Sequence, residues 1–598
     1  MNDSVTKRLS ALRMRMKERG IDVYVIPSSD FHGSEYTGDY FKAREYATGF
    51  NGSAGTAVIL ADSAYLWTDG RYFIQAEKQL KGSGVLLQRA GEEGVPSIED
   101  FLKKNLLEGG VIGFDGRVVS AETGEKYQKI AEEKKGGIFW EEDLVGAVWK
   151  DRPHMSKEPF FFLEEQYFGR SAAEKISCVR KKMKEAGAKA YILASLCDIA
   201  WLLNVRGNDI RHVPVVLSYL VLTGRECIWF VQEGVVKEDQ REYFEKNRIG
   251  LRPYEEIYAY AASLSDTAVL LDPEKVNYRI AGSIPENAKK IIGKNPTESM
   301  KAVKNKTETD NTIRAHIKDG VAVTKFIFWL KKRVGTGTLT ELSAAEYLEK
   351  MRKEQEHFLD TSFDTICAYG ENAAMMHYAA EPGRGAALKP EGFLLVDSGG
   401  HYLEGTTDIT RTIALGPVTE QMKRHFTAVL RGCINLASAR FLYGARGQDL
   451  DILAREPLFC MGLDYKCGTG HGVGHLLSVH EGPNAFRFGK SADRAQTAVL
   501  EEGMVTTDEP GVYLKGAYGI RTENELLCQK AEKNEYGQFM RFETITYAPI
   551  DLDAVIADDM TQRERAFLNE YHRKVYETLA FYLTEEEKLW LKENTRAI

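Results

Sequence analysis

Two segments of the chain share a pattern in which hydrophobic residues recur with a helical period and lead into a short β-branched or aliphatic run. The pattern covers residues 8–20 before Val23–Ile26, and residues 175–187 before Tyr191–Leu193. The two copies match at a constant offset and each helical pattern ends in a glycine. Because a helix followed by a strand is a recurring unit of α/β folds, the repeat predicts two successive α/β domains of similar build.

The pattern changes after residue 305, where helical and strand patterns alternate and a helix-rich tail follows. We expect helices over 313–330 and 421–443, strands over 393–396, 406–415, 504–514 and 519–528, and the tail over 538–598. Prolines at 153, 159 and 296 interrupt the periodicity and mark boundaries. The predicted domains are 1–155 (α/β), 156–305 (α/β) and 306–598 (α+β).

The chain has 598 residues, 43% of them hydrophobic, and is too long to fold around a single hydrophobic core. We therefore expect a globular protein of several domains. The net charge is −8 and no Lys/Arg stripe stands out, so we expect no nucleic-acid partner. The first ten residues are polar and no apolar run reaches about 18 residues, so we expect no membrane span and a cytoplasmic location. The eight cysteines include no CxxC pair, which argues against a disulfide framework or a zinc knuckle.

Candidate chemistry lies in the last third of the chain, on segments with strand and turn patterns. Four carboxylates and one imidazole form the set: Asp397, Asp408, His471, Glu509 and Glu523. One divalent ion seldom needs four acidic ligands, whereas two adjacent ions need carboxylates that bridge them and cancel about four positive charges. A metal pair lowers the pKa of bound water toward about 7 and so makes a nucleophile. The set therefore predicts a two-metal hydrolytic site.

Strand alternation places several of these residues on common faces. Asp397 follows an apolar run and precedes Ser-Gly-Gly, so the chain should reverse there. On the returning strand Asp408 shares a face with Thr410, and a hairpin would bring both aspartates to one cavity. The same period of two puts Arg521 on the side of Glu523.

The glycine-rich stretch around His471 fits neither of two familiar motifs. It does not satisfy GxGxxG, and Gly472 and Gly474 disfavour the helix that a zinc pair of His471 and His475 would need. Close approach of the backbone to a metal or substrate explains these glycines better. For two other histidines, His377 and His480, the residues alone leave a structural and a functional role open.

The site residues lie in six short motifs: VDSGG (396–400), TDITRT (407–412), GTGHGVG (468–474), VHEGP (479–483), TDEPG (507–511) and GIRTEN (519–524). Further motifs occur earlier: FNGSAGT (50–56), WTDGRYF (67–73) and IAWLLNVRG (199–207). With these motifs nearly the whole chain resembles the long, three-domain form of the aminopeptidase P (Xaa-Pro aminopeptidase) family. The resemblance implies two tandem creatinase-N-like α/β domains followed by a pita-bread metallopeptidase domain.

The resemblance also implies a metal assignment. Asp397, Asp408 and Glu523 would hold one ion. Asp408 and Glu523 would bridge the two ions, and His471 and Glu509 would complete the ligands of the second. Mn²⁺ is the implied metal, with Zn²⁺ and Co²⁺ as alternatives, and the oxygen-rich ligand set agrees with a hard ion.

Relatives attack the carbonyl that precedes proline with a metal-bridging hydroxide, and the equivalent of Glu509 serves as proton shuttle. By the same resemblance His377 and His480 would orient the substrate and stabilise the tetrahedral intermediate. Arg521 would lie near the proline-side pocket. The implied substrates are peptides with N-terminal Xaa-Pro, and the implied assembly is a homodimer.

One position departs from the family pattern. Long-form relatives commonly carry a further active-site histidine four residues before the position of His471, where this chain has Cys467. His475 lies four residues after it, and whether it takes over the missing contact is open. Two roles are equally open for Cys467, that of an oxidation-sensitive thiol and that of an unreactive small residue.

Two other activities compete with an aminopeptidase. A prolidase would share the metal ligands but cut Xaa-Pro dipeptides, and the length and the doubled N-terminal region argue against it. A non-catalytic pita-bread module would bind peptides or proteins without hydrolysis. Retention of all five ligands argues against that class.

Overall fold

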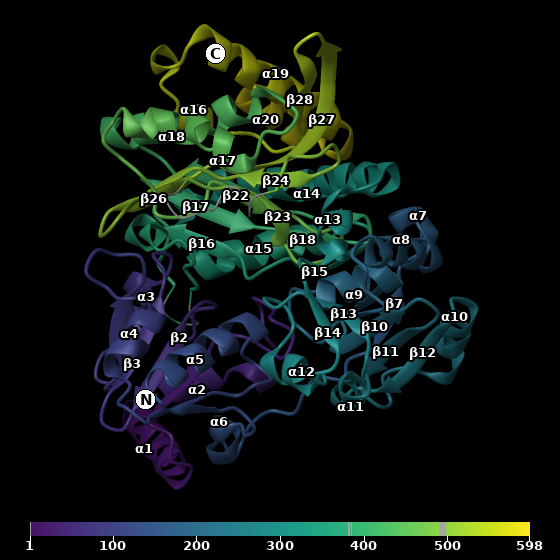
Figure 1. Cartoon of the computed structure of the whole chain (residues 1–598). Helices are drawn as coiled ribbons and strands as arrows, with labels where there is room; N and C mark the ends of the chain where they lie inside the picture. The colour runs from purple at the N-terminus through teal and green to yellow at the C-terminus, as the bar shows by residue number, and fades with distance from the viewer. Residues whose placement is uncertain (1, 381–382, 384, 489–497) are drawn as a thin grey trace. The chain divides into compact units, whose positions relative to one another are not determined.

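The structure is a computed structural model that describes residues 2–380, 383, 385–488 and 498–598. The chain divides into two compact units, Met1–Phe162 with Arg170–Thr297, and Leu163–Gly169 with Glu298–Ile598. Figure 1 labels many of the helices and strands of both units. The boundaries expected near residues 155 and 305 stay predictions. In the part of the chain described, every helix is too short or too polar to span a bilayer, and all eight cysteines are free thiols.

The first unit contains two six-stranded sheets of the same topology, ordered β4-β3-β2-β1-β5-β6 and β12-β11-β10-β8-β13-β14. Strand β1 is antiparallel to β2 and parallel to β5, as β8 is antiparallel to β10 and parallel to β13. This equivalence confirms the two predicted α/β domains of similar build.

The elements around the first sheet are α1 (Asn2–Glu18), β1 (Val23–Pro27), α2 (Ala43–Thr48), β2 (Thr56–Leu60), β3 (Ala64–Thr68), α3 (Phe73–Leu80), β4 (Leu86–Arg89), α4 (Ile98–Asn105), β5 (Val111–Gly113), α5 (Ala121–Glu133), β6 (Gly137–Phe139) and α6 (Leu144–Val148). Those around the second are β7 (Phe160–Phe162), α8 (Ala172–Glu185), β8 (Ala190–Leu193), α9 (Leu196–Leu203), β9 (Val205–Gly207), β10 (Ser218–Thr223), β11 (Cys227–Val231), α10 (Arg241–Lys246), β12 (Ile249–Pro253), α11 (Glu256–Ala262), β13 (Ala268–Leu271), α12 (Tyr278–Ser283) and β14 (Lys289–Ile292).

The second unit begins with α7 (Glu165–Phe168) and resumes within α13 (Pro296–Ala302). It continues with α14 (Lys306–Arg333), α15 (Glu341–Lys353), β15 (Phe358–Thr361), β16 (Ile366–Tyr369), β17 (Phe393–Ser398), β18 (Gly400–Tyr402), β19 (Gly405–Thr406), β20 (Ile409–Ala414), α16 (Glu420–Ala437), β21 (Arg440–Leu442), α17 (Gly447–Leu450) and α18 (Ile452–Phe459). The last elements are β22 (Gly470–Gly472), β23 (Glu481–Phe486), β24 (Val505–Asp508), β25 (Gly511–Leu514), β26 (Tyr518–Arg521), β27 (Asn524–Asn534), β28 (Gly537–Thr544), α19 (Gln562–Leu579) and α20 (Glu585–Asn594).

The sheets of the second unit are β21-β28-β27-β24-β22-β23, β16-β17-β20, β15-β18-β19 and β25-β26. Helix α16 packs against them through buried residues at i, i+3, i+4, i+7 and i+8, from Phe426 to Ile434. Its first turn is capped by Thr419, whose side chain accepts from the amide of Met422. The mixed α+β organisation predicted for this region is confirmed.

The helix expected over 421–443 is wrong at its C-terminal end. Helix α16 ends at Ala437, and Arg440–Leu442 form β21, which pairs antiparallel with β28. The pattern misled because Phe441 is buried as an edge-strand residue at a position that also fits the helical period. Pairing with a strand about a hundred residues later decides the conformation here, and no local pattern reports it.

Candidate metal centre

Asp397 and Asp408 belong to two paired segments of the second unit. Asp397 lies in β17, which pairs antiparallel with β20 and sets Asp397 directly opposite Thr410. Opposed residues share a face of the sheet. Asp408 lies directly before β20, and its carboxylate is close enough to that of Asp397 for the two charges to interact. The predicted antiparallel pairing is confirmed, but the reversal expected directly after Asp397 is wrong, because the chain continues into β18 and reverses between β18 and β19.

Three strands that the sequence predicts as continuous are interrupted at candidate ligands. The strand expected over 406–415 divides into β19 and β20, that over 504–514 into β24 and β25, and that over 519–528 into β26 and β27. Asp408, Glu509 and Glu523 occupy the three breaks. The three continuous strands are therefore wrong, and Pro510, which has no N–H to donate to a ladder, accounts for the break at Glu509.

The breaks tie each glutamate to a neighbouring segment. The amide of Glu509 donates to the carbonyl of Thr469 (2.8 Å), and that of Glu523 donates to the carbonyl of Thr410 (3.1 Å). The hydroxyl of Thr410 donates to Glu523 Oε2 (2.7 Å). Glu509 is thereby anchored beside β22 and Glu523 beside β20.

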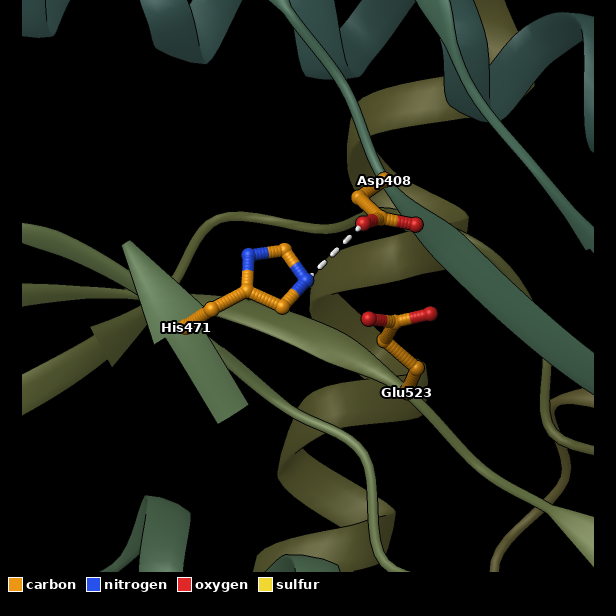
Figure 2. Close-up of side chains that lie close together, drawn as sticks. All are labelled: Asp408, His471 and Glu523. Atoms are coloured by element: carbon orange, nitrogen blue, oxygen red, sulfur yellow. Dashed lines mark ion pairs between the residues drawn. The ribbon is translucent and has the colours of Figure 1, made fainter. Parts of the chain in front are cut away.

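His471 lies in β22 between two glycines. A Cβ on Gly470 would collide with the carbonyl of Thr507, and one on Gly472 with the carbonyl of Glu481. The sequence predicted a close approach to a metal or substrate at these glycines, whereas the structure shows a close approach to the backbone of neighbouring strands. Glycine on both sides of His471 lets β22 lie between β23 and β24, and Figure 2 shows the His471 ring turned toward Asp408 and Glu523.

The imidazole of His471 meets two of the carboxylates. Its Nε2 lies 3.5 Å from Asp408 Oδ2 and 3.5 Å from Glu509 Oε1. Its Nδ1 lies 3.0 Å from the carbonyl of Gly472, which can only accept, so Nδ1 carries the hydrogen and Nε2 presents its lone pair. One ligand atom each of Asp408, His471 and Glu523 lies within 4.8 Å of the others, and Figure 2 shows the three side chains converging.

The electrostatics of this cluster favour a cation. Burial raises the pKa of Asp408 well above its ordinary value, and the carboxylates of Asp397 and Glu509 raise it further. Burial likewise raises the pKa of Glu523, with Asp408 and Glu509 as the next causes. Asp397 Oδ1 is buried without a hydrogen-bond partner. Carboxylates crowded in this way fit divalent ions, which would supply the charge that their surroundings lack.

Arg521 supplies part of that charge from the protein itself. Its guanidinium pairs with Asp397 and donates to the hydroxyls of Thr410 (3.1 Å) and Tyr513 (2.6 Å). Arg521 and Glu523 therefore meet at Thr410, although the strand assumed to align them is interrupted. Arg521 is 3% exposed, so its described contacts fix Asp397 and the surrounding hydroxyls.

Three histidines differ in their surroundings. The ring of His480 stands edge-on to that of His471, with 4.3 Å between centroids. His475 is buried, its Nε2 lies 2.8 Å from the carbonyl of Tyr167, and its Nδ1 lies 3.2 Å from Thr312 Oγ1. Both ring nitrogens of His475 are thus engaged by other groups, which argues against its taking over a metal-site contact. His377 is partly buried in the turn before Tyr378, and its role stays a prediction.

Cys467 is partly buried and packs against the hydrophobic cluster to which Tyr513 also contributes. Its carbonyl accepts a hydrogen bond from Arg455 Nη2 (2.7 Å). Burial raises the pKa of Tyr513, the residue that bonds Arg521, and Cys467 is among the nearby groups that raise it further.

Sequence reasoning assigned no role to two polar residues that organise the cluster. Glu525 Oε1 accepts from the amide of Asp408 (2.7 Å), and its Oε2 lies 3.0 Å from His316 Nε2. A period of two counted from Glu523 was the available signal for Glu525. Thr410 was placed on the correct face, but its hydrogen bonds to Arg521 and Glu523 had no local signature.

Comparison with known proteins agrees with this architecture. The Creatinase/Prolidase N-terminal domain matches residues 8–136 and 151–308, Metallopeptidase family M24 matches 310–530, and its C-terminal region matches 538–598. Aminopeptidase P1 of Arabidopsis thaliana is 36% identical over 99% of both chains. A probable Xaa-Pro aminopeptidase P of Laccaria bicolor is 38% identical over 98% of this chain and 93% of its own.

Solved structures give the same result. The X-prolyl aminopeptidase of Caenorhabditis elegans, described as a cytosolic enzyme with a di-nuclear active site, is 34% identical and superposes with a TM-score of 0.94 over 99% of this chain and 100% of its own. An Xaa-Pro dipeptidase of Bacillus anthracis, 22% identical, covers 64% of this chain with a TM-score of 0.50 and shares the fold alone.

The fold and the cluster of acidic residues define a metallopeptidase of family M24, with two creatinase-type domains ahead of a pita-bread catalytic domain. The predicted fold class is confirmed. Within that class the chain belongs to the Xaa-Pro aminopeptidase P family. It is a metal-dependent aminopeptidase, and the family together with its di-nuclear neighbour supports a centre for two divalent metal ions.

Proposed function

We propose that this protein releases the N-terminal residue of peptides whose second residue is proline. The observation that carries the proposal is the buried convergence of Asp408, His471 and Glu523 in a chain similar from end to end to Xaa-Pro aminopeptidases. Similarity over the full length, including both N-terminal domains, favours this activity over that of a prolidase.

We further propose that five residues hold the two ions: Asp397, Asp408, His471, Glu509 and Glu523. Asp408 and Glu523 would be shared by both ions, since burial and neighbouring carboxylates raise the pKa of both and two cations would relieve both. Asp397, whose Oδ1 is buried without a hydrogen-bond partner, would help to hold one ion. His471 and Glu509 would help to hold the other. Mn²⁺ is proposed as the metal because carboxylate oxygens suit hard ions.

When bound, the metal pair supplies an activated water at neutral pH and polarises the substrate carbonyl. Glu509 is suited to shuttle a proton, because its side chain is 21% exposed and lies 3.4 Å from Thr507 Oγ1. The ring of His480 stands edge-on to that of His471. We propose that His480 and His377 orient the peptide and donate hydrogen bonds to the carbonyl oxygen that gains charge during hydrolysis. Substrate binding by Arg521 also stays a proposal.

The activity is tested on protein stripped of metal and reloaded with Mn²⁺, Zn²⁺ or Co²⁺. We expect Mn²⁺ to restore cleavage of Arg-Pro-Pro at its first bond, with Arg-Ala-Ala as the peptide control. Hydrolysis confined to Xaa-Pro dipeptides would identify a prolidase instead. Protein that retains no metal and cleaves none of these peptides would identify a binding module.

The ligand assignment is tested by substitution. Asp408→Ala is expected to lower both bound metal and activity to background, because it removes a bridge. Asp360→Ala, which changes an exposed aspartate of the same unit, serves as control and should leave both unchanged. An active Asp408→Ala enzyme with two bound ions would contradict the assignment.

We also propose a homodimer in the cytoplasm. The Caenorhabditis elegans relative is described as cytosolic, and the dimer is expected from the family alone. Light scattering on the purified protein should give twice the chain mass of 67.2 kDa, and a single-chain mass would exclude the dimer.

A further inference from the structure

We propose that Glu341 is a positioning residue for His377. Its carboxylate accepts hydrogen bonds from residues on both sides of His377 along the chain, between residues 369 and 378 and at residue 386. The inference rests on the proposed function, because holding His377 in place matters only where this histidine acts on the substrate.

Glu341 is the first residue of α15 and is fully buried. Its two carboxylate oxygens accept four hydrogen bonds, all from neutral donors. Oε1 accepts from the amide of Tyr369 (2.7 Å) and from Asn372 Nδ2 (3.0 Å). Oε2 accepts from the hydroxyl of Tyr378 (2.8 Å) and the amide of Ala386 (2.7 Å). A buried carboxylate needs such a set of donors, and this one draws them all from a single loop.

The four donors bracket His377 along the chain. Two of them precede it, Tyr378 follows it directly, and Ala386 lies beside Ala387, which forms an isolated antiparallel bridge with Thr340. The backbone reinforces the return, since the amide of Glu341 donates to the carbonyl of Ala386 (3.0 Å). The amide of Tyr378 donates to the carbonyl of Met375 (3.1 Å) and closes the turn that contains His377. Both sides of this turn are therefore tied to one side chain.

The opposite side of the loop rests on strands that lead to the metal centre. Gly519 of β26 has no room for a Cβ against the carbonyl of Ala373, so the loop and β26 are in close contact. Tyr378 and Tyr513 pack on the same small hydrophobic cluster, and Tyr513 bonds Arg521. The segment bonded to Glu341 is thus in contact with β26, the strand that carries Arg521. Movement of about 1 Å in a positioned group can cost roughly 100-fold in rate.

Glutamine cannot replace Glu341 without a conflict. In either orientation of its amide, the NH₂ group faces a backbone N–H, that of Ala386 or that of Tyr369. A backbone N–H cannot turn away as a hydroxyl can. The substitution therefore keeps the shape of the side chain and releases at least one end of the loop.

The test uses the full-length protein loaded with Mn²⁺ and the peptide Arg-Pro-Pro. Glu341→Gln is expected to lower kcat by about 30-fold with little change in KM, the signature of an interaction made in the transition state. Metal content should stay at the wild-type value. In a His377→Ala background the same substitution should cost less than about twofold, because residues that act as a unit are not additive.

Tyr378→Phe gives a second, milder variant that removes one hydroxyl and keeps the ring. It is expected to lower kcat by about fivefold and to have no further effect in the His377→Ala background. It decides the question if Glu341→Gln fails to fold.

Asp209→Asn is the matched control. Asp209 is a buried carboxylate of the first unit that accepts from Ser156 Oγ (2.6 Å) and from the amides of Glu158 (2.9 Å) and Leu217 (2.8 Å). Its substitution should lower the melting temperature and leave kcat unchanged.

Two outcomes would overturn the inference while the wild type cleaves Arg-Pro-Pro. One is a normal kcat in both Glu341→Gln and Tyr378→Phe. The other is full additivity of their effects with His377→Ala. A metal-loaded wild type that cleaves no Xaa-Pro peptide would instead overturn the proposed function.

Discussion

Asp408→Asn should stabilise the metal-free protein and abolish its activity. The oxygens of Asp408 and Glu523 lie within 4.8 Å of each other. At an effective dielectric constant of about 20, two unit charges at that distance repel by about 3.5 kcal/mol. Protonation relieves part of this in the wild type, since burial and neighbouring carboxylates raise the pKa of both groups. We expect a net gain of about 1–2 kcal/mol from the amide, which keeps the shape and loses the charge.

The assay is thermal unfolding in EDTA and then with excess Mn²⁺. The wild type should gain about 2.7 kcal/mol when the free metal is about 100 times its Kd. Asp408→Asn should melt above the wild type in EDTA and show almost no further gain with Mn²⁺. Peptide cleavage, followed in parallel, should be absent.

Asp319→Asn is the control, because it makes the same chemical change in the same unit with the opposite charge environment. Asp319 pairs with buried Arg352 at 2.7 Å, so its neutralisation leaves an uncompensated cation and should lower the melting temperature in EDTA. The reasoning is refuted if Asp408→Asn also melts below the wild type in EDTA, or if it keeps the full Mn²⁺-dependent gain.

Three further outcomes follow from buried polar groups of the second unit. Arg411→Lys should lower the free energy of unfolding by about 3 kcal/mol or more in a denaturant titration, since the guanidinium donates to six oxygens, including the carbonyl of Glu523, and an ammonium has three N–H groups. His572 accepts from the amide of Ile550 (3.1 Å) and burial lowers its pKa to about 3, so only the unfolded chain takes up this proton between about pH 6.5 and 3. As the pH is lowered through that window, the free energy of unfolding should therefore decrease by up to about 5 kcal/mol. His572→Gln should remove this part of the pH dependence in acid titrations. Thr410→Val should lower kcat/KM for Arg-Pro-Pro about tenfold, because it removes the hydroxyl that bonds Glu523, and an unchanged kcat/KM would argue against that role.

The parts of the molecule that sequence reasoning captures are those with a local period. Alternation by two correctly placed Thr410 on the face that it shares with Asp397, because a strand fixes side-chain direction independently of what it later pairs with. The repeat of helix and strand in residues 8–26 and 175–193 likewise anticipated two sheets that share one topology.

Contacts between distant segments were beyond that reasoning. The loop that holds His377 is fixed by Glu341, and the carbonyl of Glu523 by Arg411, more than a hundred residues away. Neither contact leaves a periodic trace. The strand breaks at Glu509 and Glu523 were predictable only in part. Pro510 is a local signal for the first break, whereas the second depends on the hydrogen bond between Glu523 and β20.

Charge links stability to chemistry in the second unit. Arg521 balances Asp397, but the remaining carboxylates of the centre face one another, and burial raises the pKa of Asp408 and Glu523. Folding alone therefore assembles a site that is strained by its own charge. Two divalent ions would remove that strain at the same place where they activate water. As the pH rises and the carboxylates lose their protons, the affinity for metal should therefore rise, whereas the stability of the metal-free unit should fall, because the pKa of Asp408 and Glu523 is raised only in the folded protein.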